Sequence, residues 1–338
     1  MRFARKPLFA AAVALTALTA AAGCSSSGGS GSSGSSGGDP SNLSSVTLNV
    51  GDQKGTGAEA VLQASGLLKT LPFKVSWSDF TSGPSMVEAM SSGAVDIGGV
   101  GDAPPVFAAS GGQNIEIVGA RTTPYGDSDA IVVPKNSPIH SISQLRGKKI
   151  AVSFGSSDDY HLLSVLSRNG LSPKDVTLEN LQPAPGLAAF SSGAIDAWDI
   201  WPPYVQQLVS QDGGRILVTG KPYGSPYSFE VASKSAVQDP AKAKAIKVYL
   251  ATLNKAYRWT DTHVAQWAAE WGQATGLPAS IMDKAAKVSV NVPATITPAV
   301  VASEQNIVDQ FYSAGLIPSK VNMSQYITSQ YNGTVGGS

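Results

Sequence analysis

The sequence predicts an α/β protein with two similar lobes, and two observations lead to this expectation. Short apolar segments alternate with helical ones at the spacing expected of mainly parallel α/β layers. In addition, residues 79–107 have an echo in residues 183–205, where SSGAVD at 91–96 is matched by SSGAID at 191–196. Each copy predicts a turn, a short helix, a glycine stop, a short strand and a Pro-Pro loop. Two copies in one chain suggest two lobes that face each other across a gap lined by these segments.

Composition excludes several classes of function. The chain has 338 residues, 42% of them hydrophobic, which is enough for one large domain or two of ordinary size. The formal net charge is +0 and no basic stripe is present, so we expect no nucleic-acid partner. The single cysteine, Cys24, excludes a disulfide framework and any cysteine-based metal cluster.

The N-terminal segment has the pattern of a lipoprotein signal peptide at residues 1–23. Positive residues at 2, 5 and 6 precede an apolar run at 8–22, and small residues lead up to Cys24, the expected lipidated (palmitate-bearing) residue. The alternative is an ordinary secretory signal in which Cys24 falls by chance. Residues 24–45 are rich in Ser and Gly and predict a flexible tether. We therefore expect an extracytoplasmic domain anchored to the outer face of the cell membrane.

The elements of the first lobe are expected at residues 46–129 and 228–338, with the second lobe at 130–227. Strands are predicted at 46–50, 73–77, 95–100 and 115–120 in the first part, and at 130–133, 150–152, 176–178, 195–201 and 216–218 in the second. The β-like segment 227–232 is expected to return to the first lobe. From residue 239 onward the pattern is helical, at 241–258, 263–273, 280–286 and 298–314, and its aromatic residues are interpreted as packing.

One loop has the order of an anion-binding segment. The strand at 150–152 is followed by the small-residue loop SFGSS at 153–157 and then by a helix. Free backbone N–H groups and the positive end of a helix dipole favour an anion at such a place. A plain helix cap is the alternative interpretation of the same residues.

The chain resembles a two-lobed solute-binding protein of an ABC importer, of periplasmic-binding-protein type II, and within that class the group for aliphatic sulfonates, taurine and nitrate. The resemblance spans roughly residues 46–314 and is carried by GDQKG at 51–55, SGPSMVEA at 82–89, GAVD at 93–96, GDAPP at 101–105, LRGKK at 145–149, GSS at 155–157 and AWDIW at 197–201. It implies a fold in which the ligand lies between the lobes, which close on it by hinge motion.

The resemblance also implies ligand contacts, and the loops involved each follow a strand, as ligand-binding loops of α/β sheets do. The implied contacts are Gln53, Lys54, Ser82, Gly83, Pro84, Gly101 and Asp102 in the first lobe, and Ser156, Ser157, Trp198 and Trp201 in the second. Two tryptophans three residues apart on a regular strand do not both point to one face. Trp198 is therefore favoured for the cleft over Trp201.

Several acidic residues depart from the pattern of that group. Asp158 and Asp159 follow the serine pair where small or His-like residues are expected, Asp199 separates the tryptophans, and Pro202 replaces an acidic residue. Glu230 on the return strand adds another acid. A helix cap explains Asp158 equally well. The hypothesis that these acids face the cleft predicts a ligand with an amine, as in taurine.

The resemblance implies a non-catalytic receptor that captures a sulfonate or taurine and delivers it to an ABC permease and ATPase. Nitrate, bicarbonate and thiamine-precursor pyrimidines are alternative ligands for similar chains, and a sensor domain is an alternative role. An enzyme of the same scaffold is disfavoured, because the sulfinate desulfinase it resembles needs a nucleophilic cysteine and the chain has only Cys24. No metal or triad spacing is visible around the three histidines. We expect a monomer without a cofactor.

Overall fold

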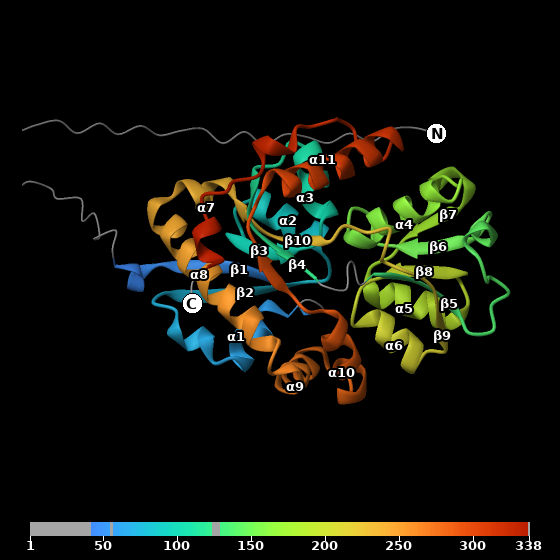
Figure 1. Cartoon of the computed structure of the whole chain (residues 1–338), viewed down its shortest axis with the longest axis horizontal. Coiled ribbons are helices and arrows are strands. Elements are labelled where there is room, and N and C mark those ends of the chain that lie inside the picture. Colours follow the sequence, from blue (N-terminus) through green and yellow to red (C-terminus); the bar gives the residue numbers. More distant parts are fainter. Residues whose placement is uncertain (1–41, 55–56, 124–128, 337–338) are drawn as a thin grey trace, which may run out of the picture. The chain divides into compact units, whose positions relative to one another are not determined.

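The computed structural model describes residues 42–54, 57–123 and 129–336 (Figure 1). Its strands form two separate sheets. Sheet A has the order β11-β4-β10-β3-β1-β2, with bounds Val292–Ala294, Ile115–Thr122, Tyr227–Ser233, Ile97–Val100, Thr47–Gln53 and Lys74–Phe80. Sheet B has the order β7-β6-β8-β5-β9, with bounds Thr177–Asn180, Lys149–Val152, Ala197–Ile200, Ala130–Pro134 and Gly214–Thr219.

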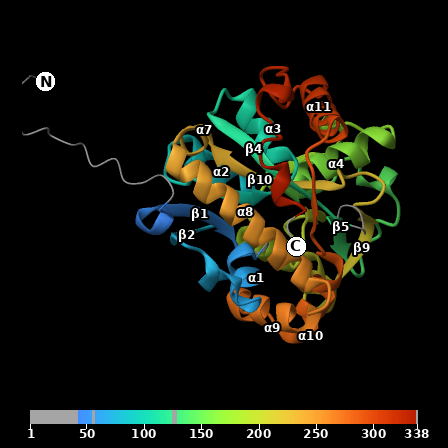
Figure 2. The ribbon, with the colours of Figure 1, turned by 60° about the vertical axis from the view of Figure 1, so that its left-hand side comes forward.

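Helices cover both faces of each sheet (Figures 1 and 2). On one face of sheet A pack α1 (Ala58–Ala64), α8 (Pro240–Thr260), α9 (Val264–Thr275) and α10 (Ala279–Val288). On the other pack α2 (Gly83–Ser91), α3 (Ala103–Ser110) and α11 (Pro298–Ser313), while the short α7 (Lys234–Gln238) follows β10. Sheet B carries α4 (Ser157–Arg168) on one face and α5 (Pro183–Ser192) and α6 (Tyr204–Ser210) on the other. We call these groups the sheet A lobe and the sheet B lobe.

The two copies of the sequence repeat have the same role in the two sheets. Each contributes a helix and the following strand, α2 and β3 in one lobe and α5 and β8 in the other. Asp96 accepts a hydrogen bond from the Asn49 amide at 2.9 Å, and Asp196 accepts one from the Lys149 amide at 2.8 Å. In both lobes the shared aspartate thus ties the helix–strand connection to a neighbouring parallel strand, β1 or β6. The residues that the two repeat copies share therefore have a structural role.

The observed sheets are mixed, whereas the sequence predicts mainly parallel layers. β10 lies between β3 and β4 and runs antiparallel to both, and β11 is antiparallel to β4. In sheet B, β5 is antiparallel to both of its neighbours. Alternating strands and helices predict parallel crossovers, but they do not show where a strand from later in the chain is inserted. The segment 227–232, expected to return to the first lobe, forms β10 in the middle of sheet A.

The Pro-Pro loop expected in the first repeat copy is wrong, and two elements were not predicted. Pro104 and Pro105 do not form a loop after β3, because they lie in the first turn of α3, where a residue without an N–H loses no helical hydrogen bond. Residues 204–210 and 292–294 form α6 and β11, which the sequence interpretation leaves unassigned. Among the described residues, no helix has both the length and the apolar composition that a membrane span needs.

Candidate functional site

Residues from both lobes line one large cavity. Its volume is about 990 Å³, open solvent at its mouth included. The lining starts at the carboxyl ends of β1, β3 and β4 and continues through the first turns of three helices and the segment that follows β8. It comprises Gln53, Gly83, Gly101, Asp102, Pro104, Arg121, Thr122, Thr123, Asp129, Ser156, Ser157, Trp201, Pro202, Ser225, Pro226, Tyr227, Ser228, Trp267, Trp271, Val288, Ser289, Val290 and Asn291.

The N-terminus of α4 brings backbone donors to this cavity. Ser156 is the N-cap residue, but its hydroxyl donates to the Ser153 carbonyl at 2.5 Å and does not cap the helix. The amides of Ser157 and Asp158 belong to the first turn, which has no acceptor within the helix. Both amides therefore stay available to an acceptor at the positive end of the helix dipole.

The N-terminus of α2 supplies the amides of Gly83 and Ser85 from the opposite lobe, while Pro84 between them has no N–H. Gly83 lines the cavity, and the first turn of α2 lacks a side-chain cap. The Ser82 hydroxyl is buried beside this turn and makes no hydrogen bond to the described residues. We call the first turns of α2 and α4 together the paired helix ends. One comes from each lobe, so a ligand that accepts hydrogen bonds from both would hold the lobes together.

The N-terminus of α3 contributes less to hydrogen bonding. The Asp102 Oδ1 atom accepts the Ala103 amide at 2.8 Å, and the next two residues are prolines without an N–H. Burial, reinforced by Asp129, raises the pKa of the Asp102 carboxyl well above its usual range. The raised pKa favours the neutral form of Asp102, which repels an anion less than the carboxylate does.

Two close contacts fix the distance between these elements. A Cβ atom on Gly101 would lie 2.9 Å from the Ser157 Cβ, so only glycine at 101 lets the end of β3 approach the start of α4 this closely. Gln53 at the end of β1 donates from Nε2 to the Gly99 carbonyl at 2.9 Å. This bond holds the Gln53 side chain along β3 beside the cavity.

Tryptophans form an apolar wall of the cavity. Trp267 and Trp271 of α9 stack with ring centroids 5.0 Å apart and planes 13° from parallel. The indole N–H of Trp271 donates to the Lys54 carbonyl at 2.8 Å, which fixes that ring. Trp201 lines the cavity from the sheet B lobe. Both rings also belong to a hydrophobic core of the sheet A lobe, as the packing interpretation predicts, and the periodicity of the helix gives no sign of their second position at the cavity.

A family model and several known proteins match this chain. The model, described as the NMT1-like family, matches residues 39–272. A protein of Escherichia coli K12 named as an aliphatic sulfonates-binding protein is 35% identical over 289 residues, which cover 84% of this chain and 89% of that protein. The taurine-binding periplasmic protein of the same organism is 36% identical over 181 residues, or 53% of this chain and 55% of that protein.

The chain belongs to the NMT1-like family. Among solved structures, the alkanesulfonate-binding protein SsuA from Xanthomonas axonopodis pv. citri, bound to MOPS, has a TM-score of 0.79 at 30% identity and covers 84% of this chain and 99% of that one. The periplasmic aliphatic sulphonate binding protein SsuA from Escherichia coli has a TM-score of 0.74 at 33% identity. The match covers 83% of this chain and 92% of that one. The fold is therefore the two-lobed periplasmic-binding-protein fold, which confirms the fold class and the resemblance noted in the sequence.

The two tryptophans of the AWDIW segment are placed opposite to expectation in this NMT1-like chain. Trp198 is fully buried and packs on Gly186 of α5, where a Cβ would lie 2.7 Å from the ring. Trp201 lines the cavity and packs edge-on against Tyr204. The reason is the length of β8, which ends at Ile200. Trp201 lies beyond the strand, where strand alternation no longer fixes its direction.

The acids that depart from the family pattern do not face the cavity. The Asp199 carboxylate contacts Nδ1 of His161 at 2.8 Å, and both residues are fully buried in the sheet B lobe. Glu230 accepts from Arg121 at 2.6 Å beneath sheet A. Asp158 accepts the Ser153 amide at 3.1 Å. A buried carboxylate needs a partner of this kind, and short polar loops and neighbouring strands supply them here. Asp158, Asp199 and Glu230 therefore give no basis for an amine-bearing ligand, whereas Asp102 and Asp129 do line the cavity.

The other predicted contacts fall into two groups. Gln53, Gly83, Gly101, Asp102, Ser156, Ser157 and Trp201 line the cavity. Outside its lining lie Lys54, Ser82, Pro84, Asp158, Trp198, Asp199 and Glu230. Lys54 is largely exposed and pairs with Asp79 at 3.2 Å.

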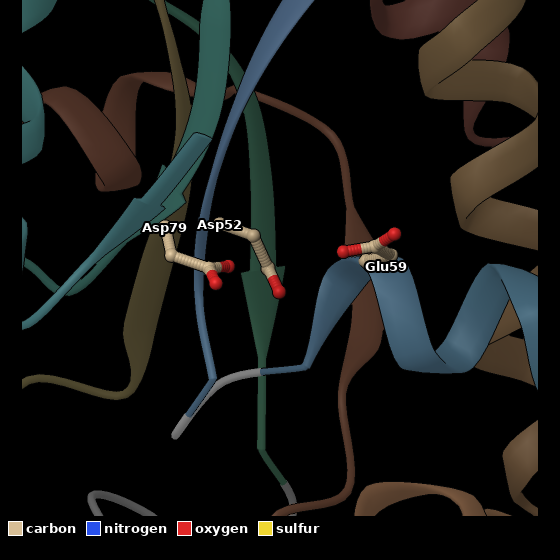
Figure 3. A group of neighbouring side chains, drawn as sticks. All are labelled: Asp52, Glu59 and Asp79. Atoms are coloured by element: carbon tan, nitrogen blue, oxygen red, sulfur yellow. The ribbon is translucent and has the colours of Figure 1, made fainter. Parts of the chain in front are cut away.

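One group of carboxyls near the end of β1 has the composition of a metal site. Oxygen atoms of Asp52, Glu59 and Asp79 lie within 4.8 Å of one another (Figure 3). Asp52, however, accepts the Ala58 amide at 3.0 Å at the start of α1, and Asp79 pairs with Lys54. Burial raises the pKa of Asp52 to about 7, so near neutral pH much of this residue is uncharged. A helix cap and a surface ion pair account for the group.

Proposed function

We propose that this NMT1-like protein is an extracytoplasmic solute-binding receptor that takes a small sulfonate into the cavity. The observation that carries the proposal is the pair of helix N-termini, one from each lobe, at a single cavity. A sulfonate has three oxygen acceptors and one negative charge, which suits several backbone donors at positive helix ends. The relatives named for sulfonate and taurine binding support the same class of ligand.

The apolar wall favours a particular kind of sulfonate. Trp201, Trp267 and Trp271 offer flat hydrophobic surfaces, and the described acids Asp158, Asp199 and Glu230 are engaged elsewhere. An ammonium group on the ligand would lose water and gain no free carboxylate among these three. We therefore propose that an aliphatic tail is preferred over the aminoethyl tail of taurine, and that nitrate or bicarbonate leaves the wall unused.

Binding would act through lobe closure. A ligand held by donors of both lobes stabilises the closed form over the open one by its differential affinity for the two. We propose that an ABC permease and its ATPase recognise this closed form, that the receptor works as a monomer without catalysis, and that Cys24, outside the described residues, carries the membrane anchor.

The ligand class is tested by calorimetry on the mature protein. Butanesulfonate, taurine, nitrate and a hydroxymethylpyrimidine are titrated in phosphate or acetate, because common buffers with sulfonate groups would compete. We expect butanesulfonate to bind at least about tenfold more tightly than taurine, which corresponds to roughly 1.4 kcal/mol. Tight binding of the pyrimidine or of nitrate, with none of butanesulfonate, would refute the proposal.

A matched pair of variants tests the paired helix ends. Ser157→Pro removes one amide donor at the first position of α4, where proline is well tolerated and the preceding residue is already extended. Ser157→Ala keeps that amide and removes only the hydroxyl. Because a hydrogen bond to a charged group contributes about 1.5–3 kcal/mol, the proline variant should bind butanesulfonate roughly tenfold or more weakly than the alanine variant. Equal affinities would show that the α4 amide does not contact the ligand.

A further inference from the structure

Two buried acids lie directly behind the α4 end of the proposed sulfonate site. The Asp159 Oδ2 atom accepts the Gly155 amide at 2.8 Å. Asp158 accepts the Ser153 amide on Oδ2 and the Asp159 amide on Oδ1, both at 3.1 Å. Their exposed fractions are 0% for Asp158 and 5% for Asp159. Neither acid lines the cavity. Both accept hydrogen bonds from the segment 153–159, part of which does line it.

These carboxyls fix the conformation of residues 153–156. Gly155 has a φ of +78°, in the left-handed region, and the position of a Cβ there would lie 3.2 Å from the ring of Phe107. The amide and the hydroxyl of Ser156 both bond the Ser153 carbonyl. The Asp159 carboxyl closes this turn by reaching back from the third residue of α4, as an acid does in a capping box. The next residues along the chain are Ser156 and Ser157, which line the cavity.

An anion at the start of α4 would therefore lie close to the Asp159 carboxyl, only a turn of backbone away. The titratable groups that act on the pKa values of these acids are Asp199 from β8, which affects both, and Asp129 before β5, which affects Asp158. His161 is engaged by Asp199. The surroundings of Asp159 therefore contain more carboxyls than cations, and an added anion would raise the cost of ionising it.

We propose that Asp159 is a positioning residue for the sulfonate site, and that its protonation is coupled to ligand binding, so that the receptor takes up a proton as the anion binds. This inference rests on the proposed function. Two effects of one side chain are involved. The hydrogen bond to Gly155 positions the loop in either protonation state, whereas the negative charge opposes the anion only in the ionised state.

The direction of the pH dependence follows from where Asp159 titrates. Burial raises the pKa of Asp159 to about 6, the hydrogen bond from Gly155 opposes that rise, and Asp199 adds to it. The pKa of Asp158 is raised well above its usual range, again by burial and then by Asp199 and Asp129. A bound anion raises the pKa of Asp159 further. Sulfonate affinity should be highest below pH 6 and should fall as the pH rises above it.

The test uses the mature protein with butanesulfonate, which stays ionised throughout, at pH 5 and pH 8 in buffers without sulfonate groups. Calorimetry in two buffers of different ionisation enthalpy counts the protons taken up. We expect wild-type affinity to be roughly three- to tenfold higher at pH 5, with net proton uptake near pH 6.5. Equal affinities at the two pH values and no proton uptake would overturn the coupling.

Three variants separate charge from position. Asp159→Asn keeps an acceptor for the Gly155 amide without the charge, so its affinity at pH 8 should rise to the wild-type value at pH 5 and become independent of pH. Asp159→Ala loses the acceptor and should bind more weakly than wild type at pH 5. Asp283→Asn removes an exposed acid on α10 and should keep the wild-type pH dependence. Wild-type behaviour of both position-159 variants would overturn the proposal.

A readout without ligand separates this inference from the proposed function. The NMR signal of the Gly155 amide should titrate near pH 6 in the ligand-free wild type and stay constant in Asp159→Asn. If no sulfonate binds but Gly155 titrates in this way, the proposed function fails and the coupling to sulfonate fails with it, while the positioning contact stands. A Gly155 signal that does not change with pH overturns the role of Asp159 directly.

Discussion

At the scale of single residues, the hydrogen-bond partner of each acid decides its role, whether the acid is buried or, like Asp196, half-buried. Asp96 and Asp196 accept strand amides, Asp199 pairs with His161, and Glu230 pairs with Arg121. None of these four carboxylates lines the cavity. Residue type alone does not separate an acid that binds a ligand from one that holds a loop, because both need hydrogen-bond donors when buried.

The two tryptophans of the second repeat copy provide a prediction at this scale. Trp198→Leu removes a fully buried ring and should lower the free energy of unfolding by about 2–4 kcal/mol, while butanesulfonate affinity stays within about twofold. Trp201→Leu removes a ring from the cavity wall and should weaken binding by roughly tenfold with a smaller loss of stability. Urea denaturation and calorimetry measure the two quantities. The reverse pattern would assign Trp198 to the ligand.

At the scale of elements, the N-terminal turns of the helices differ in how many backbone N–H groups they leave available to a ligand. The first turn of α3 has a side-chain cap from Asp102 and two prolines, whereas that of α2 has one proline and that of α4 none, and both lack side-chain caps. All three begin just after the carboxyl end of a strand, the place where α/β sheets bind ligands. Which end receives the anion is decided by the capping chemistry of a few residues.

The contact between the end of β3 and the start of α4 provides a prediction at this scale. Gly101→Ala places a Cβ 2.9 Å from that of Ser157 and should keep the two lobes from approaching fully. We expect butanesulfonate affinity to fall roughly tenfold. Gly333→Ala, which meets no atom within 4 Å, is the matched control and should bind as wild type.

The double variant Gly101→Ala with Ser157→Gly removes the opposing Cβ atom and keeps the backbone amide of residue 157. It should recover most of the lost affinity in the same calorimetric measurement. If Gly101→Ala binds as tightly as wild type, the close approach of β3 and α4 is not needed for the bound state.

At the scale of the whole molecule, each lobe has its own sheet, and the two lobes meet at α4, where Tyr160 and Leu163 join a hydrophobic core of the sheet A lobe. Tyr160 of α4 accepts from Gln310 of α11 at 3.1 Å and packs against Phe311. Thr81 and Gln182 are joined at 2.9 Å, and Lys284 of α10 donates to Ser210 of α6 at 3.2 Å. A ligand that changes the relative position of the lobes would have to rearrange these contacts.

The proposed membrane anchor is a property of the whole chain and can be tested in cells. Labelled palmitate should be incorporated into the wild-type protein and into Ser25→Ala, but not into Cys24→Ala, because Cys24 is the only thiol in the sequence. Gel fluorography of the immunoprecipitated protein measures incorporation. Label retained in Cys24→Ala would contradict lipidation at this residue.

The sequence by itself determined the alternation of elements, the repeat and the family. Local patterns suffice for these, since glycine stops, N-cap residues and apolar periodicity depend on near neighbours along the chain. The shared SSGAVD and SSGAID segments form equivalent connections because the same local interactions recur around Asp96 and Asp196.

Only the tertiary structure decided which side chains line the cavity. Trp267 and Trp271 come from α9, more than sixty residues after the nearest predicted contact in sheet B, and they meet the cavity because α9 packs beside β1 and α1. Asp199 and Glu230 turn inward because their partners, His161 and Arg121, lie on elements that only the fold brings to them. Burial and hydrogen-bond pairing depend on residues distant in sequence, so a local pattern does not specify them.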